Sequence, residues 1–154
     1  MNNTLTIQKK LAHFINFNSH PHASYYNTID GILHAENVLE DIKKVMGLLQ
    51  KEFVVINYFQ DISIDLFLKN LAQSLVFGKT VFIVTHTLRF DPIVYDKLME
   101  IRLENRLPYS LQDGKKENIA PRAKIFIVFE NKDEINIKNF YDLTDHVLNL
   151  KEEI

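Results

Sequence analysis

Three short apolar runs constrain the fold of this chain more than any other feature of its sequence. They span Phe53–Tyr58, Val81–Thr85 and Lys124–Phe129, and helical patterns lie between them. Continuous apolar runs, in contrast to alternating ones, are typical of parallel strands that are covered on both faces. Nucleotide-binding folds of this type carry a glycine-rich phosphate loop directly after such a strand, and none of the three runs opens into one. The sequence therefore predicts the frame of a nucleotide-binding fold without its phosphate loop.

The length and composition of the chain indicate one α/β domain that spans residues 1–154. Of its 154 residues, 46% are hydrophobic and 25% are charged, which is ordinary for a globular domain. Residues 1–10 are mostly polar and are a candidate flexible segment. The chain has no cysteine, which excludes disulfides, thiolate catalysis and cysteine-based metal centres.

Charge and hydropathy exclude two classes of partner. The formal net charge is −2, and no cluster of lysine and arginine provides the basic surface that a nucleic-acid-binding protein needs. No stretch reaches the roughly 18 consecutive apolar residues of a membrane-spanning helix, and the first residues lack the apolar centre of a signal peptide. We expect a cytoplasmic protein that has neither nucleic acid as its primary partner nor a membrane partner.

The first third of the chain predicts one strand and one long helix. Leu11–Phe17 is a candidate first strand, which the turn-rich segment Asn18–His22 ends. From Ile29 to Leu49 the apolar residues follow helical spacing, with Thr28 or Asp30 available as the N-cap.

The next two helices carry clear signals at their ends. Ser63 is a candidate N-cap for a helix over 64–76, and Gly78 stands just past its end, where a positive φ is favoured. Asp91 followed by Pro92 predicts a second N-cap and a helix that runs to about Arg106.

The last third predicts a hairpin insert, a strand, a helix and a final strand. Asp113-Gly114 is a turn signal in the middle of 107–121, so this segment is a candidate hairpin insert before the run at Lys124–Phe129. A short helix over Ile135–Leu143 and a strand over His146–Leu150 follow. The resulting order, β-α-β-α-β-α-hairpin-β-α-β, predicts a three-layer α/β sandwich with a mainly parallel sheet of about five strands.

Polar residues gather where the predicted strands end, and ligand sites of open parallel sheets lie at that edge. His86 is the acid–base candidate of this cluster. The cluster consists of Asn57, Asp61, Thr85, His86, Asp91, Glu130 and Asn131.

Two other motifs favour structural interpretations. Gly78-Lys79-Thr80 matches the end of a phosphate-binding loop, but it closes a helix and opens a strand, which is the reverse of the required order. His20, His22 and His86 could converge at strand ends, yet they lack the spacing of any common metal site. We expect no bound metal and no cofactor.

From the second helix onward the chain resembles a degenerate AAA+ ATPase core, closest in pattern to the arms that include dynein motor modules and McrB-like proteins. In such proteins the matching pieces are the helix before Walker B, the Walker B strand, the next helix, the sensor strand with its hairpin insert, and the fifth strand. These correspond to Phe67–Gly78, Val81–Val84, Phe90–Val94, Ile119–Phe129 and Asp145–Leu150.

The chain departs from this family at the positions that carry chemistry. Thr85 and His86 stand where the Walker B acids would hold magnesium, and Asn131 stands where a sensor asparagine would be. No Walker A loop follows the candidate first strand, and the C-terminal helical lid is missing. Without a phosphate loop and its carboxylates the triphosphate has no charge compensation, so the resemblance implies a pseudoenzyme.

Three functional hypotheses follow from the sequence. The first is a non-catalytic protein-interaction module, an adaptor or assembly subunit, that binds a protein partner or a second copy through aromatic surface residues. The second is a small-molecule or nucleotide-binding enzyme that uses the strand-end cluster. The third is a regulatory domain with a phosphorylatable Ser63. The aromatic candidates are Tyr25, Tyr26, Tyr58, Phe59, Tyr95, Tyr109, Phe140 and Tyr141.

Overall fold

A parallel five-stranded sheet in the order β2-β3-β4-β1-β5 forms the centre of the chain. The computed structural model describes residues 3–18, 29–33, 37–59, 62–87, 89–109, 119–120, 122–130 and 138–150. The helices are α1 (Asn3–Asn18), α2 (Leu39–Leu49), α3 (Ile64–Val76), α4 (Pro92–Glu104) and α5 (Lys138–Leu143). The strands are β1 (Ile29–Leu33), β2 (Phe53–Tyr58), β3 (Thr80–Thr85), β4 (Lys124–Phe129) and β5 (Val147–Asn149).

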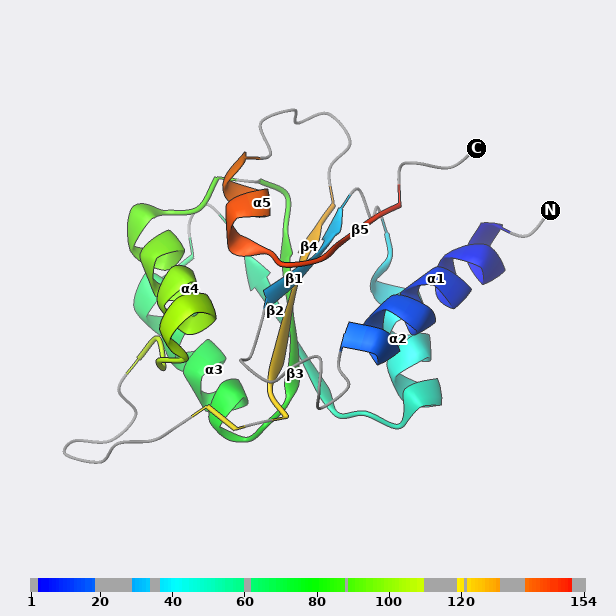
Figure 1. The fold of residues 1–154 in the computed structure, drawn as a ribbon, viewed down its shortest axis with the longest axis horizontal. Coiled ribbons are helices and arrows are strands. Elements are labelled where there is room, and N and C mark those ends of the chain that lie inside the picture. The colour runs from blue at the N-terminus through cyan, green and yellow to red at the C-terminus, as the bar shows by residue number, and fades with distance from the viewer. Residues whose placement is uncertain are drawn as a thin grey trace.

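The helices form a layer on each side of this sheet (Figure 1). Helices α3, α4 and α5 cover one face, and α1 and α2 cover the other. All strand pairs are parallel, and every residue of β3 and β4 is buried. The predicted three-layer α/β sandwich with a parallel sheet is therefore confirmed, and the three apolar runs of the sequence are β2, β3 and β4.

Each face of the sheet has its own hydrophobic core. On the α1/α2 side, the rings of Phe82 and Phe126 stack with their centroids 5.3 Å apart. On the α3/α4/α5 side, the Tyr58 ring packs edge-on against Phe67 at 5.3 Å. Alternate side chains of β3 and β4 enter the two cores, which is why these strands have no polar face.

The predicted first strand at Leu11–Phe17 is wrong, because this segment belongs to α1. Leu11 and Ile15, four residues apart, are both fully buried, which is the spacing of one helix face. Gln8 donates from Nε2 to Oδ1 of Asp41 at 2.9 Å and ties α1 to α2. Because α1 begins at Asn3, much of the candidate flexible segment 1–10 is helical.

The long helix predicted from Ile29 is also wrong in its first half. Residues Ile29–Leu33 form β1, which pairs with β4 on one side and β5 on the other, and the helix begins only at Leu39. Asp30 is therefore no N-cap. Val38 occupies the N-cap position of α2 without a side-chain hydrogen bond, while Thr28 lies outside the described residues. A central strand that contains Asp30-Gly31 lacks the apolar continuity that revealed β2, β3 and β4.

The predicted helix ends of α3 and α4 are largely confirmed. Oγ of Ser63 accepts from the Leu66 N–H at 3.3 Å, and Gly78 has a φ of 73°. Asp91 caps α4, which ends at Glu104, two residues before the predicted Arg106. The C-cap of α4 is a left-handed asparagine.

The C-terminal third agrees with the prediction where it is described. Helix α5 and strand β5 lie inside the predicted ranges 135–143 and 146–150, and β5 is parallel to β1. The predicted hairpin insert at 107–121 lies mostly outside the described residues. Among the described helices, none is long and apolar enough to cross a bilayer.

Candidate functional site

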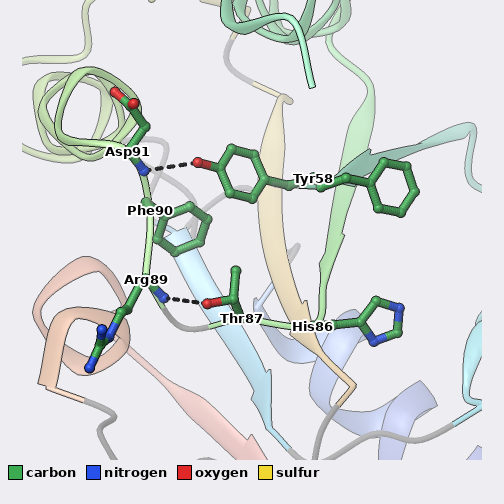
Figure 2. A pocket seen from close by; sticks show the side chains of 7 residues that line it. Tyr58, His86, Thr87, Arg89, Phe90 and Asp91 are labelled. Atoms are coloured by element: carbon green, nitrogen blue, oxygen red, sulfur yellow. Dashed lines mark hydrogen bonds between the residues drawn. The ribbon is translucent and has the colours of Figure 1, made fainter. Parts of the chain in front are cut away.

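A cleft of about 610 Å³ lies where β2 and β3 reach their carboxyl ends (Figure 2). It lies between the end of β2 and the loop that leads from β3 into α4. The carboxyl edge of a parallel sheet is where α/β folds place ligands, so this cleft is the main candidate site within the described ranges. We call it the β2–β3 cleft, and its lining residues are Tyr58, Phe59, His86, Thr87, Arg89, Phe90 and Asp91.

The loop after β3 is held by its own side chains. The buried Thr85 hydroxyl donates to the Thr87 carbonyl at 2.9 Å and accepts from the Thr87 N–H at 3.2 Å. The Thr87 hydroxyl in turn accepts from the Arg89 N–H at 3.1 Å. At the start of α4, Oδ1 of Asp91 accepts from the Ile93 N–H at 2.9 Å. These bonds fix the loop, and they engage the two threonine hydroxyls and one carboxylate oxygen of Asp91 within the protein.

Tyr58 joins the two sides of the cleft. Its ring lies 5.1 Å from the Phe90 ring, between centroids, and its hydroxyl accepts from the Asp91 N–H at 2.8 Å. Figure 2 shows this contact between the end of β2 and the start of α4. The side chain is only 6% exposed, so Tyr58 is a structural part of the cleft floor.

His86 connects the ends of β3 and β4. Its Nδ1 lies 3.3 Å from the carbonyl oxygen of Glu130, and its Nε2 lies 3.9 Å from Oε2 of the same residue. The imidazole is 63% exposed, whereas the Glu130 side chain is 16% exposed. In Figure 2 the His86 and Arg89 side chains extend in opposite directions from the cleft loop. The two basic groups therefore flank the cleft and do not converge on one point.

The structure brings together four residues of the predicted strand-end cluster. Thr85, His86 and Asp91 lie on or beside one loop, and Glu130 contacts His86. Oδ1 of Asp91 caps α4, while His86 lies beside Glu130. Parallel pairing places these residues at one edge, as the prediction requires.

The other predicted site residues are not part of this arrangement. Asn57 is exposed on β2 and does not line the cleft. Asp61 and Asn131 lie outside the described residues, as do His20 and His22. Within the part of the chain that is described, no group of three or more histidine and carboxylate side chains could hold a metal ion.

The aromatic candidates divide into core and surface. Phe140 is fully buried and Tyr58 nearly so, whereas Phe59 is 52% and Tyr141 is 45% exposed. Tyr95 and Tyr109 are partly buried, and Tyr25 and Tyr26 lie outside the described residues.

The site residues predicted from the sequence did not include three lining residues of the cleft. Thr87, Arg89 and Phe90 follow β3 directly, at the same edge as His86 and Asp91. Their position after a buried strand was the available signal. Selecting only residues capable of acid–base or metal chemistry hid an aromatic and an arginine that suit recognition.

A second polar constellation lies near the amino ends of β1 and β4. Nζ of Lys124 lies 2.7 Å from Oδ2 of Asp30, and the two side chains are 1% and 0% exposed. Oδ1 of Asp30 accepts from the main-chain N–H of His146 at 3.0 Å and lies 3.1 Å from its Nδ1. The Arg102 guanidinium forms an ion pair with neighbouring Asp145 at 2.9 Å.

Burial dominates the electrostatics of this ion pair. Removal from water lowers the pKa of Lys124, and the charge and hydrogen bond of Asp30 oppose that shift only in part. The pair joins β1 to β4, and His146 extends it to the residue before β5. Because its two side chains are buried and join neighbouring strands, we assign the pair a structural role.

The sequence that follows β1 also lacks a phosphate-binding loop. A Walker A loop would follow β1 and open α2, over the residues that begin His34-Ala-Glu-Asn-Val38. This segment contains neither glycine nor lysine. The chain matches no known family model, and no curated protein resembles it significantly.

Proposed function

We propose that this chain is a non-catalytic protein-interaction module, an adaptor or assembly subunit, and that the β2–β3 cleft is a binding surface for an apolar side chain of its partner. The observation that carries the proposal is that side-chain oxygens in and beside the cleft bond within the protein, while an aromatic and an arginine side chain are exposed. The oxygens of Thr85, Asp91 and Tyr58 hold the loop together, whereas Phe59 and Arg89 are exposed.

The residue types that line the cleft favour binding of a partner over catalysis. Exposed aromatic and arginine side chains carry much of the binding energy at protein interfaces. A catalytic site needs a nucleophile or an acid–base group within reach of a second group that activates it. In the described cleft, Nε2 of His86 lies 3.9 Å from Oε2 of Glu130, which is longer than a hydrogen bond.

The resemblance to AAA+ proteins forms part of the same proposal. From α3 to β5 the elements follow one another in the order that a degenerate AAA+ core implies. Thr85 ends β3 and His86 follows it, where the resemblance would put the Walker B acids, and neither supplies a carboxylate for magnesium. A fold that has kept its frame without these groups suits a pseudoenzyme that acts through contacts.

Selection of displayed peptides on the immobilised protein tests the proposal, with affinities then measured by fluorescence polarisation. We expect Phe59→Ser and Arg89→Ser to weaken binding of the selected peptides by at least about tenfold each. Phe77→Ser and Arg106→Ser are matched controls, because Phe77 is 75% exposed at the end of α3 and Arg106 is exposed after α4. Equal losses in the control variants, or the absence of any selectable peptide, would contradict the proposed surface.

The size of the cleft favours one alternative, a small-molecule or nucleotide-binding enzyme. Its volume of about 610 Å³ lies within the range of roughly 300–1,000 Å³ that small-ligand sites occupy. Thermal unfolding against nucleotides, common metabolites and Mg²⁺, Mn²⁺ or Zn²⁺ tests this alternative, because a ligand of the native state raises the midpoint. A shift that His86→Ala abolishes would favour the enzyme over the adaptor.

A further inference from the structure

The sheet ends on one side at β2, whose outer edge no described strand pairs with. The order of strands places β2 at one edge and the three-residue β5 at the other. Strand β2 has six residues, Phe53-Val-Val-Ile-Asn-Tyr58, and among them there is neither a charge nor a proline. Charged side chains, prolines and short length are the usual protections of an edge strand against pairing. β5 is protected by its length, and β2 is not.

The hydrogen-bond parity of the sheet shows which main-chain groups of β2 point outward. The Thr80 N–H donates to the Glu52 carbonyl at 3.4 Å, and bonding residues alternate along a parallel ladder. Residues 54, 56 and 58 therefore direct their N–H and C=O groups to β3. The main-chain groups of Phe53, Val55 and Asn57 point away from the sheet. Bonds from Lys124 to Lys79 and from Glu130 to Thr85 agree with this parity on the other side of β3.

We propose that two copies of this chain pair through β2 in antiparallel orientation, about a two-fold axis at Val55. The outward residues are spaced symmetrically around Val55, so Phe53 of one copy faces Asn57 of the other and Val55 faces itself. Each such facing pair exchanges two main-chain hydrogen bonds. The pairing is isologous and closes at two copies, which joins the two sheets without leaving a long edge for further addition.

The flanking residues fit a second copy as the occupant of this edge. In the same register Lys51 faces Phe59 of the other copy and Glu52 faces Tyr58, so no like charges are opposed. Phe59 is 52% exposed at the end of β2, and a lysine stem and ammonium group can cover such a ring. With a net charge of −2 per chain, repulsion between two copies is small. This inference goes beyond the proposed function, because it concerns self-association through the lateral edge of the sheet; Phe59, which follows β2, lies both at this edge and in the cleft.

Sedimentation equilibrium and amide hydrogen exchange on the full chain, from low to high micromolar concentration, test the proposal. We expect a monomer–dimer equilibrium in which the amides of Phe53, Val55 and Asn57 become protected as dimer forms. The amides of Val54 and Ile56, which bond to β3, are expected to be protected at every concentration.

Two substitutions at one position sharpen the test. Val55→Pro removes an outward N–H from each copy and leaves the bonds to β3 in place, as proline at an edge strand allows. We expect it to raise the dimer dissociation constant by about tenfold to a hundredfold. Val55→Thr keeps the N–H and the β-branched shape and is expected to dimerise like the wild type. Thermal unfolding shows whether each variant is folded, and Arg89→Ser separates this result from that of the cleft, since it should leave dimerisation unchanged.

Three outcomes would overturn the proposal. The first is a monomer at every concentration with fast exchange at the outward amides. The second is protection of those amides that does not depend on concentration, because the cover would then come from within one chain. The third is a dimer that Leu103→Lys, at an apolar residue of α4 that is 66% exposed, dissociates and Val55→Pro does not.

Discussion

The buried pair of Lys124 and Asp30 gives the sharpest prediction about stability. Replacing Lys124 by methionine keeps the length and most of the apolar volume of the side chain but removes its charge. Asp30, which is 0% exposed, then stays in the core without its cation at 2.7 Å. Breaking a buried ion pair from one side costs about 3–5 kcal/mol, because the remaining charge is neither hydrated nor paired.

We expect Lys124→Met to fall at the lower end of this range, at about 3 kcal/mol. Asp30 keeps the main-chain N–H of His146 at 3.0 Å and the imidazole Nδ1 at 3.1 Å, and hydrogen bonds to a charged group compensate part of its lost pairing. For 154 residues with an unfolding entropy of about 2.1 cal/mol/K per residue, this loss lowers the melting temperature by about 9 °C.

Urea unfolding of a double-mutant cycle measures the effect. Asp30→Asn keeps an oxygen that can accept from His146, so the double variant Lys124→Met/Asp30→Asn retains that contact and has no buried charge. We expect the double variant to be more stable than the sum of the single losses predicts, by about 2 kcal/mol. Lys97→Met is the matched control, because Lys97 and Glu100 form a 3.5 Å pair whose side chains are 38% and 31% exposed.

A loss below about 1 kcal/mol is expected for the control, as is usual for exposed pairs. If Lys124→Met costs no more than Lys97→Met, or if the two changes in the cycle add without coupling, the reasoning from burial is refuted. A coupling free energy of the expected size would show that the contact between Lys124 and Asp30 stabilises the fold.

Three further predictions concern single positions. A Cβ on Gly31 would collide with the Phe140 ring, so Gly31→Ala is expected to destabilise the fold by about 1–3 kcal/mol in urea unfolding. Gly47 has nothing within 4 Å of such a Cβ, so Gly47→Ala is expected to stabilise the fold by about 0.5–1 kcal/mol, and the opposite order would contradict the packing. Asp91→Ala removes the N-cap of α4 and is expected to cost about 0.5–2 kcal/mol by the same assay, and an unchanged stability would show that the cap contributes nothing. Burial lowers the pKa of Lys124 in the folded protein, so between that pKa and the ordinary lysine value of about 10.4 the unfolded chain binds more protons than the folded one. The free energy of unfolding should therefore rise with pH across this interval. The free energy of unfolding of Lys124→Met, measured over the same pH range, should lack this rise.

Much of the fold could be predicted from apolar patterns, and the failures have one cause. Strands β3 and β4 are buried on both faces and so read as continuous apolar runs. Strand β1 is buried just as fully, but Asp30 and Gly31 stand in its centre, and the residues around it match a helical period as well. The aspartate is satisfied by Lys124, about ninety residues further along the chain, and no local pattern reports such a partner.

The first helix was missed for a related reason. Leu11–Phe17 is short and apolar enough for a strand, and periodicity alone does not separate such a run from one face of a helix. Its interaction with Asp41 through Gln8 and the contact of Phe14 with Phe126, whose ring centroids lie 5.9 Å apart, are tertiary. Only these contacts with α2 and the sheet identify the segment as a helix.

The candidate site was predictable as a place and not as a chemistry. The rule that parallel strands gather their carboxyl ends placed Thr85, His86, Asp91 and Glu130 near one another. The rule could not show that the Asp91 carboxylate caps α4, because an aspartate at this position also suits a ligand site. The hydrogen-bond partners of the side chain decide between these two roles, and the tertiary structure determines those partners.

The distribution of polar groups over the sheet links these observations. Near the amino ends of β1 and β4, Asp30 and Lys124 neutralise each other in the core, and at the carboxyl edge Thr85 and Asp91 are bound to their own loop. Around the described cleft, the exposed side chains include the aromatic ring of Phe59, the imidazole of His86 and the guanidinium of Arg89. If the two proposals hold, substitutions at Phe59 and at Val55 change the associations of the protein, whereas substitutions at Lys124 change only its stability.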